Sequence, residues 1–379
     1  MKSIPYGRQT INREDIKAVI SVLKSDWLTQ GPKVKEFEGA LCKYTGAKYA
    51  VVVSSGTAAL HIACLSAGLK SGDEAITSPI TFVASANCIL YCQAKPVFAD
   101  IQEDTVNIDP EEIKKKITKR TKVIIPVHFS GHPCDMEEIS RIAKKHNLII
   151  IEDACHALGA EYRGARIGAC KYSDMAVFSF HPVKSITTGE GGAILTNNRK
   201  YYEKLLLFRT HGIIKEKSKL RNKTEGSWYY EMQELGFNYR ITDLQCALGM
   251  SQLGRIESFI ESRRKIVNIY NENLSGVKDI FLLREYKNVK SAWHIYCVRL
   301  KDYKQKKNVF LKLQSAGISP QVHYMPVHLQ PYYKDNFSYK MGNYEKAEAY
   351  YQRAITLPLY PELKPNEAEY VLSVLRKAL

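Results

Sequence analysis

Three short stretches of the sequence carry polar side chains directly after apolar runs of strand length. SSGT (residues 54–57) follows YAVVV, EDACH (residues 152–156) follows LIII, and HPVKSITTGEGG (residues 181–192) follows DMAVFSF. In an open α/β sheet, ligands bind outside the carboxyl ends of the strands. We therefore expect the three stretches to meet at one edge of a sheet and to form a site for a small molecule.

The first stretch has the composition of an anion site. Gly56 permits a close approach of the backbone, and amides at a helix N-terminus together with the Thr57 hydroxyl suit a phosphate group. Ser179, two residues before His181, adds a hydroxyl at the end of another predicted strand. A Ser-Gly-Thr sequence is also an ordinary start of a capped helix, so both interpretations stand at this point.

The other two stretches supply an acid and an amine. A carboxylate such as Asp153 at the end of a buried strand is costly unless it is paired or hydrogen-bonded. It predicts either an N-cap or structural ion pair, or a partner for a protonated heteroaromatic nitrogen of a cofactor. Lys184 is either a surface lysine or an amine whose pKa is lowered in a desolvated site, where it attacks a carbonyl. The coincidence of phosphate cradle, carboxylate and lysine favours the cofactor interpretation.

These residues need a scaffold, and the chain supplies an α/β pattern. Apolar strands alternate with amphipathic helices from residue 47 to about 200, which predicts right-handed crossovers and a mainly parallel sheet covered on both faces. Asp109 and Pro110 are expected as cap and first residue of one helix. Residues 214–230 are polar and predict a lid or a surface loop, and a helical stretch over residues 241–274 is expected to break near Gly254.

The tail adds helical segments and two strand-like pieces, SAWHIYCVRL and ISPQVHY. We therefore expect a large domain over residues 1–250, with an N-terminal segment that contacts the substrate, and a smaller α/β domain over residues 251–379. The chain of 379 residues is long enough for two such domains.

Composition excludes several other classes of protein. Hydrophobic residues make up 45% and charged residues 25% of the chain, which is ordinary for a soluble globular protein. No run is long enough for a membrane span, the start MKSIPYGRQT has no signal-peptide pattern, and the nine cysteines form no CxxC pair. We expect a cytoplasmic protein with reduced thiols, no metal centre and no membrane association. The net charge of +16 is spread over many segments, so it predicts solvated helix faces or attraction for an anionic substrate rather than nucleic-acid binding.

The order of motifs resembles a known family. SSGTAAL, ITFVASAN, IEDACHALGA, SFHPVKSITTGEGGAILTNN and GFNYRITDLQCALG follow one another with the spacing of the DegT-type nucleotide-sugar aminotransferases. These enzymes use pyridoxal 5′-phosphate (PLP) and have the aspartate-aminotransferase fold, fold type I of the PLP-dependent transferases. The resemblance runs from about residue 5 to the C-terminus.

The resemblance implies a role for each matching residue. Lys184 forms the Schiff base with PLP, and Asp153 pairs with the pyridine nitrogen. The implied cofactor contacts are Gly56, Thr57 and Ser179 to the phosphate, Phe82 stacked on the ring, His156 near the ring hydroxyl, and Asn238 reaching the phosphate of a neighbouring subunit. The implied substrate contacts are Tyr6, Asp26, Trp27, Leu28, Thr29, Gln321, Val322, His323 and Tyr324. A homodimer with composite sites follows from the role of Asn238.

Within the family, the strings LTQG, SFH and QVHYMP are most similar to transaminases of the pseudaminic acid pathway. That similarity implies transfer of an amino group from glutamate to C4 of a UDP-linked 4-keto-6-deoxy sugar with an N-acetyl group. The alternatives are a C3 or C4 aminotransferase for a dTDP- or GDP-linked keto sugar, a sugar dehydratase, and a DNA-binding regulator that keeps the fold. The dehydratase would lack the Schiff-base lysine, and only the net charge supports the regulator.

Overall fold

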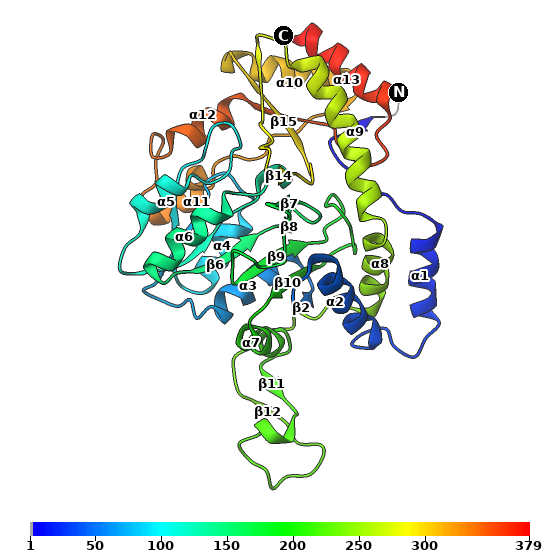
Figure 1. The fold of residues 1–379 in the computed structure, drawn as a ribbon, viewed down its shortest axis with the longest axis vertical. Helices are drawn as coiled ribbons and strands as arrows, with labels where there is room; N and C mark the ends of the chain where they lie inside the picture. The colour runs from blue at the N-terminus through cyan, green and yellow to red at the C-terminus, as the bar shows by residue number, and fades with distance from the viewer. Residues whose placement is uncertain (1–2) are drawn as a thin grey trace.

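A seven-stranded sheet forms the centre of the larger part of the molecule (Figure 1). The computed structural model describes residues 3–379; Met1 and Lys2, which begin the first predicted domain, lie outside the described residues. In spatial order the strands are β2 (Tyr49–Val53), β10 (Gly192–Thr196), β9 (Met175–Ser179), β6 (Ile149–Asp153), β5 (Thr121–Ile125), β3 (Glu74–Thr77) and β4 (Lys95–Phe98). Only the two pairs that β10 forms, with β2 and β9, are antiparallel and the other pairs of this sheet are parallel, so the predicted mainly parallel sheet is confirmed.

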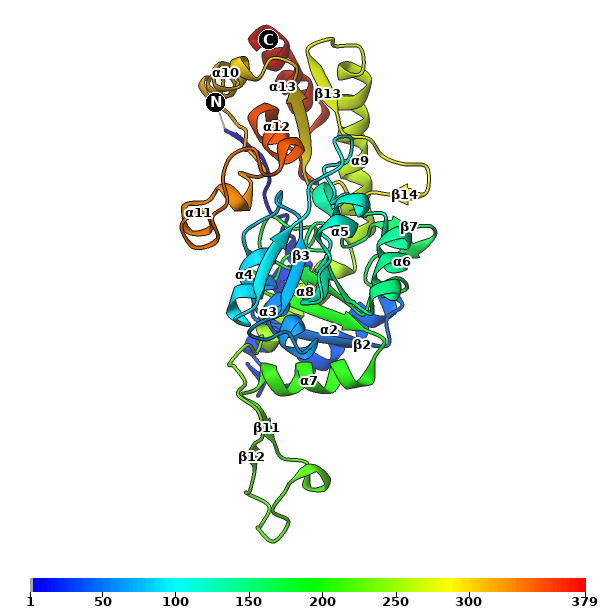
Figure 2. The same ribbon diagram turned by 90° about the vertical axis from the view of Figure 1, so that its left-hand side faces the viewer.

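Helices cover both faces of this sheet because its strands are apolar on both sides. Along β2, Val51 and Val53 face one layer while Ala50 and Val52 face the other, and all four are buried. Figure 2 shows α4 and α6 on opposite sides of the sheet. One layer contains α3 (Gly56–Ser66), α4 (Ala84–Tyr91) and α7 (Arg199–Arg209). The other contains α2 (Pro32–Thr45), α5 (Pro110–Lys116), α6 (Met136–His146) and α8 (Asp243–Leu253), with α1 (Arg13–Leu23) packed on α8.

Two predicted helix boundaries are confirmed. The Asp109 side chain accepts a hydrogen bond from the Glu111 amide at 3.0 Å, and Pro110 is the first residue of α5. The long helical stretch ends at Leu253 in α8 and resumes at Ile256 in α9 (Ile256–Leu274), on either side of Gly254. Among residues 3–379, no helix has both the length and the apolar character needed to cross a membrane.

A second core lies around a three-stranded sheet near the C-terminus. This sheet has the order β13 (Ile280–Leu282), β15 (Tyr296–Leu300) and β17 (Ala354–Leu357). It packs against α9, α10 (Lys306–Ser315) and α13 (Pro365–Ala378). The N-terminal strand β1 (Ile4–Pro5) pairs in parallel with β16 (Ile318–Ser319), and Ile4 joins this second core. A domain boundary at residue 250 remains a proposal.

The remaining elements are short. They are β7 (Glu161–Tyr162), β8 (Ala165–Arg166) and β14 (Val289–Lys290) in one small sheet, helices α11 (Pro331–Phe337) and α12 (Glu345–Arg353), and the 3₁₀ turns η1 (Phe129–Gly131), η2 (Lys217–Lys219), η3 (Tyr303–Gln305) and η4 (Val327–Leu329). Of the predicted strand ISPQVHY, only Ile318 and Ser319 are a strand, because Pro320 has no amide hydrogen to continue the ladder.

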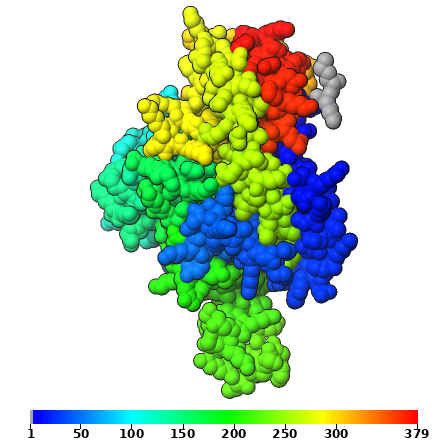
Figure 3. Space-filling view, turned by 45° about the vertical axis from the view of Figure 1, so that its right-hand side comes forward, coloured from blue at the N-terminus to red at the C-terminus, as the bar shows by residue number. Residues whose placement is uncertain are grey.

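The polar segment after α7 forms a projecting arm, which we define as residues 211–235. Its base is the two-stranded sheet of β11 (Ile213–Ile214) and β12 (Glu231–Met232). Figures 1 and 2 show the arm extending away from the sheet, and in Figure 3 it is a separate lobe of the surface. It carries exposed apolar side chains, which include Trp228 (77% exposed) and Leu235 (76% exposed).

Candidate active site

A cavity of about 730 Å³ opens at the carboxyl edge of the large sheet. Its wall combines the start of α3, the ends of β6 and β9, and residues 321–324 of the tail. The structure thus brings together most of the predicted site residues, which are Tyr6, Gly56, Thr57, Phe82, Asp153, His156, Ser179, Lys184, Gln321, Val322, His323 and Tyr324. The expectation that the three polar stretches meet at one sheet edge agrees with this arrangement.

The N-terminus of α3 forms one end of the cavity. The Ser55 side chain caps this helix by accepting a hydrogen bond from the Ala58 amide at 3.0 Å. The preceding amides, of Gly56 and Thr57, have no hydrogen-bond partner within residues 3–379. A Cβ atom at Gly56 would lie 2.8 Å from Ser179 Cβ, so only glycine lets helix and strand approach this closely. Free amides at a positive helix end, beside the Ser179 hydroxyl, make a cradle for a phosphate.

Asp153 ends β6 and is 5% exposed. Its Oδ2 accepts a hydrogen bond from the Ser85 hydroxyl at 2.5 Å, and its Oδ1 accepts one from the Cys155 amide at 3.2 Å. Within the described part of the chain, no basic side chain forms an ion pair with this carboxylate. A buried carboxylate held only by neutral donors is completed by a cationic group in the cavity, such as a protonated ring nitrogen.

Lys184 lies in the turn after β9, where its amide donates to the His181 carbonyl at 2.9 Å. Burial lowers the pKa of its amine, although the nearby acidic groups of Cys155 and Asp153 act in the opposite direction. A lowered pKa increases the fraction of neutral amine, which is the form that attacks a carbonyl carbon. The side chain lines the cavity together with Asp153, so the predicted acid and amine share one site.

Three histidines surround the lysine, and burial keeps them neutral. Burial and the charge of Lys184 hold the pKa of His156 well below its usual range, and the same causes lower the pKa of His323 to about 4. His156 Nε2 lies 3.2 Å from the Tyr324 hydroxyl, while its Nδ1 is buried with no partner in the described residues. The ring of His294 lies 4.3 Å from that of His156 between centroids. A neutral imidazole can exchange one hydrogen bond with a ligand hydroxyl without adding charge.

Two predicted groups do not line this cavity. Residues 26–29 form an exposed connection between α1 and α2, where Trp27 is 56% and Leu28 is 47% exposed. Asn238 is also exposed and bridges to Thr210 beyond the end of β2. The roles of Asp26, Trp27, Leu28, Thr29 and Asn238 therefore stay predictions.

Sequence reasoning missed several residues that lie next to Asp153 and His156. Ser85 and Thr81 lie within the quoted string ITFVASAN, but a hydroxyl on a short helix gives no signal of the carboxylate it will meet. His294 comes from the distant string SAWHIYCVRL, and only tertiary contact brings its ring to His156.

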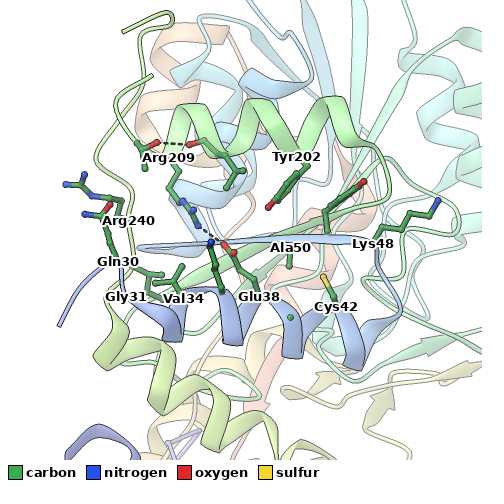
Figure 4. Close-up of a pocket in the computed structure, with 16 residues that line it drawn as sticks. Gln30, Gly31, Val34, Glu38, Cys42, Lys48, Ala50, Tyr202, Arg209 and Arg240 are labelled. Carbon is green, nitrogen blue, oxygen red and sulfur yellow. Dashed lines mark hydrogen bonds and ion pairs between the residues drawn. The ribbon is translucent and has the colours of Figure 1, made fainter. Parts of the chain in front are cut away.

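A second cavity of about 730 Å³ lies between α2, the outer edge of β2 and α7 (Figure 4). Arg209 and Glu38 meet across it at 2.7 Å, with side chains 13% and 12% exposed. Glu38 also accepts from the Val52 amide at 3.1 Å, and Arg209 donates to the Val52 carbonyl at 2.9 Å. The pair thus occupies the amide and carbonyl of Val52 on the edge strand β2, which would otherwise be open to another strand. None of the predicted site residues lines this cavity.

Comparison with known proteins identifies the chain's relatives. Residues 9–376 match the model of the DegT/DnrJ/EryC1/StrS aminotransferase family. The chain belongs to this family.

Relatives match this aminotransferase over nearly its whole length. It is 44% identical to the uncharacterized protein MJ1066 of Methanocaldococcus jannaschii, over 99% of this chain and 97% of that protein. It is 39% identical to the UDP-4-amino-4,6-dideoxy-N-acetyl-beta-L-altrosamine transaminase of Campylobacter jejuni, over 98% and 96%. Among solved structures, Helicobacter pylori PseC, an aminotransferase of pseudaminic acid biosynthesis, superposes with a TM-score of 0.92 at 34% identity, covering 100% of this chain and 99% of that one.

The protein is a PLP-dependent sugar aminotransferase of fold type I. The putative sugar aminotransferase Spr1654 of Streptococcus pneumoniae has a solved PLP form, which matches with a TM-score of 0.91 at 32% identity over 100% of both chains. The cavity fits this cofactor: free helix amides beside Gly56 suit its phosphate, unpaired Asp153 suits its ring nitrogen, and Lys184 suits its aldehyde. The predicted family, fold, enzyme class and cofactor are thereby confirmed.

Proposed function

We propose that this aminotransferase moves an amino group from glutamate to C4 of a UDP-linked 4-keto-6-deoxy-N-acetylhexose. The product would be of the UDP-4-amino-4,6-dideoxy-N-acetyl-β-L-altrosamine type. The observation that carries the proposal is the 39% identity over almost the full chain to the Campylobacter jejuni transaminase named for that product. The alternative is a C3 or C4 aminotransferase for a dTDP- or GDP-linked keto sugar, since the family model itself names no sugar.

PLP supplies, when bound, an aldehyde for the amine and a ring that accepts electrons. Lys184 then has two tasks, which are to hold the cofactor and to carry a proton to and from the donor and acceptor carbons. Burial lowers its pKa from the ordinary range of a lysine in the direction of the operating pH, which favours proton transfer. Asp153 keeps the ring nitrogen protonated by presenting a buried negative charge.

The other residues that we propose for the site fall into two groups, one for the cofactor and one for the substrate. Gly56, Thr57 and Ser179 are proposed to hold the phosphate, and Phe82 to stack on the ring. His156, kept neutral by burial, is proposed to meet the ring hydroxyl. On the substrate side we propose Tyr6, residues 26–29 and residues 321–324.

The experiment that tests the reaction is a panel of substrates. UDP-, dTDP- and GDP-linked keto sugars are incubated with the purified enzyme and glutamate, and NMR locates the new amine. We expect the UDP-linked 4-keto sugar to react fastest, with the amine at C4. Faster turnover of a dTDP- or GDP-linked sugar, or an amine at C3, would replace the proposal by its alternative.

A variant tests the role of Lys184. Lys184→Ala is expected to abolish both transamination and the visible absorbance of the covalently held cofactor, while Lys204→Ala on the surface of α7 leaves both unchanged. Retention of the visible absorbance in Lys184→Ala would contradict the proposed attachment.

We also propose a homodimer with composite sites. The arm exposes Trp228, Tyr230, Met232 and Leu235, which are 77%, 51%, 65% and 76% exposed. Large apolar side chains gathered on a projection mark a surface that another chain covers. Asn238 lies shortly after the arm and does not line the cavity of its own chain, as expected of a residue that serves a neighbouring one.

Mixing two inactive variants tests this arrangement. Lys184→Ala and Asn238→Ala are unfolded and refolded together, so that mixed dimers form. If Asn238 serves the neighbouring site, each mixed dimer regains one intact site, and about one quarter of the wild-type activity returns. If Asn238 serves its own chain, mixing restores nothing.

A further inference from the structure

Two buried hydroxyl groups lie in line behind the Asp153 carboxylate. Thr81 Oγ1 lies 2.6 Å from Ser85 Oγ, and Ser85 Oγ lies 2.5 Å from Asp153 Oδ2. Thr81 is 2% exposed and Ser85 is not exposed at all. Water therefore does not compete for these hydrogen bonds, and each is worth more than it would be at the surface.

The chemistry of the three groups fixes the direction of both hydrogen bonds. An ionised carboxylate only accepts, so the single hydroxyl hydrogen of Ser85 goes to Asp153. The carbonyl of Phe82 is a second acceptor for Ser85, but it is uncharged and lies farther away, at 3.3 Å. With its hydrogen committed, the Ser85 oxygen must accept from Thr81. The order of donation is thus Thr81 to Ser85 to Asp153.

We propose that Ser85 and Thr81 are positioning residues for Asp153. They hold Oδ2 through the hydrogen bond from Ser85 and stabilise the ionised carboxylate, so that Asp153 stays a charged acceptor for the PLP ring nitrogen. The inference rests on the proposed role of Asp153. A neutral carboxylic acid cannot form that ion pair, and a carboxylate free to rotate forms it less often.

The same hydrogen bonds connect the acid to the loop that carries the stacking ring. Thr81 precedes Phe82 directly, and both line the cavity. Anchoring the Thr81 side chain to Ser85 therefore fixes this loop relative to Asp153. The two residues proposed to contact the PLP ring, Asp153 at its nitrogen and Phe82 at its face, thus belong to one hydrogen-bonded unit.

Ser66 provides a matched control for the loss of a buried serine hydroxyl. It lies in α3, is 1% exposed, and its Oγ has no partner among residues 3–379. Ser66→Ala removes one buried oxygen without touching Asp153. Thr81→Ser gives a second control, because it keeps the hydroxyl that Thr81→Val removes.

The experiment measures PLP binding and the state of the bound cofactor in each full-length variant. The dissociation constant comes from equilibrium dialysis, the orientation of the ring from visible circular dichroism, and the stability of the cofactor-free protein from thermal melting. Because a hydrogen bond to a charged group is involved, Ser85→Ala is expected to weaken PLP binding about tenfold or more and to change the visible dichroism. Thr81→Val is expected to act in the same direction but less, and Thr81→Ser and Ser66→Ala to match wild type.

A double variant tests the relay itself. If Thr81 acts only through Ser85, adding Thr81→Val to Ser85→Ala weakens PLP binding no further. Additive effects would overturn the relay, and wild-type binding with unchanged dichroism in Ser85→Ala would overturn the whole inference. Should Ser85→Ala fail to fold, the Thr81→Val and Thr81→Ser pair decides, since equal binding in the two refutes the inference. If the wild-type enzyme binds PLP and is active, and Ser85→Ala behaves identically, then only this inference fails and the proposed function stands. If the wild-type enzyme binds no PLP, the proposed function itself is refuted.

Discussion

Replacing Gly56 by alanine would place a methyl carbon 2.8 Å from Ser179 Cβ and 3.1 Å from Ser179 Oγ. Neither side can yield easily, because Gly56 begins α3 in the packed layer over the sheet and Ser179 ends β9, an interior strand of the sheet. Forcing extra volume into a packed site costs about 1–3 kcal/mol of stability. The same displacement moves the free amides of residues 56 and 57 away from the phosphate. We therefore expect PLP affinity to fall by about a hundredfold, which corresponds to two of the cradle's hydrogen bonds to a charged group.

Urea unfolding of the cofactor-free protein and titration with PLP measure the two effects separately. Gly39→Ala is the matched control, since Gly39 is also helical but a Cβ there meets nothing within 4 Å. This control is expected to raise stability by up to about 1 kcal/mol through helix propensity. Adding Ser179→Gly to Gly56→Ala removes both crowded atoms and leaves Ser179 Cα at 3.4 Å, so stability should partly return. Unchanged stability and PLP affinity in Gly56→Ala would refute the steric reasoning.

Two further predictions concern stability. Arg209→Met leaves Glu38 charged in a 12% exposed position and should lower the free energy of unfolding in urea by about 3 kcal/mol. Arg8→Met breaks the exposed pair with Glu362 and should lower it by less than about 1 kcal/mol. Equal losses in the two variants would contradict a role for the buried pair. Burial lowers the pKa of His323 from 6.5 to about 4, so the unfolded chain binds more protons than the folded chain between these pH values. The contribution of neutral His323 to folding stability is therefore complete above pH 6.5 and is lost as the pH falls toward 4. Unfolding measured across this range should show a shallower pH dependence for His323→Gln, and an unchanged dependence would contradict the assignment.

The large sheet was predictable because its signals are local. Each strand is a short apolar run, and the alternate burial of β2 on two faces requires apolar residues at every position. Helix boundaries at Asp109 and Pro110 follow from capping chemistry that acts within one turn, and the break at Gly254 follows from the low helix propensity of glycine. The polar stretches 54–57, 152–156 and 181–192 could be assigned to one edge because parallel strands put all their carboxyl ends together.

The second core and the supporting shell of the site were not predictable in the same way. Strand β1 has only two residues and pairs with residues 318 and 319, so no periodicity in either segment reveals the pair. The arm has strands equally short, within a polar sequence that reads as a loop. Ser85 and His294 acquire their partners through packing between elements, and the sequence of their own elements contains no sign of those partners.

The wall of the active-site cavity comes from two parts of the chain, one with the groups proposed for the cofactor and one with the groups proposed for the substrate. Except for Asn238 of a neighbouring subunit, the groups proposed for PLP lie at the ends of strands of the large sheet, at the start of α3, or in the loops and turns that follow these strands. The groups proposed for the sugar nucleotide come from the N-terminal segment and residues 321–324, which are joined to each other through the ring contact of Tyr6 with His323 at 5.3 Å. The two sets touch where the Tyr324 hydroxyl meets His156 at 3.2 Å. We therefore expect substitutions among residues 321–323 to change the sugar that is accepted while the residues at the edge of the large sheet continue to hold the cofactor.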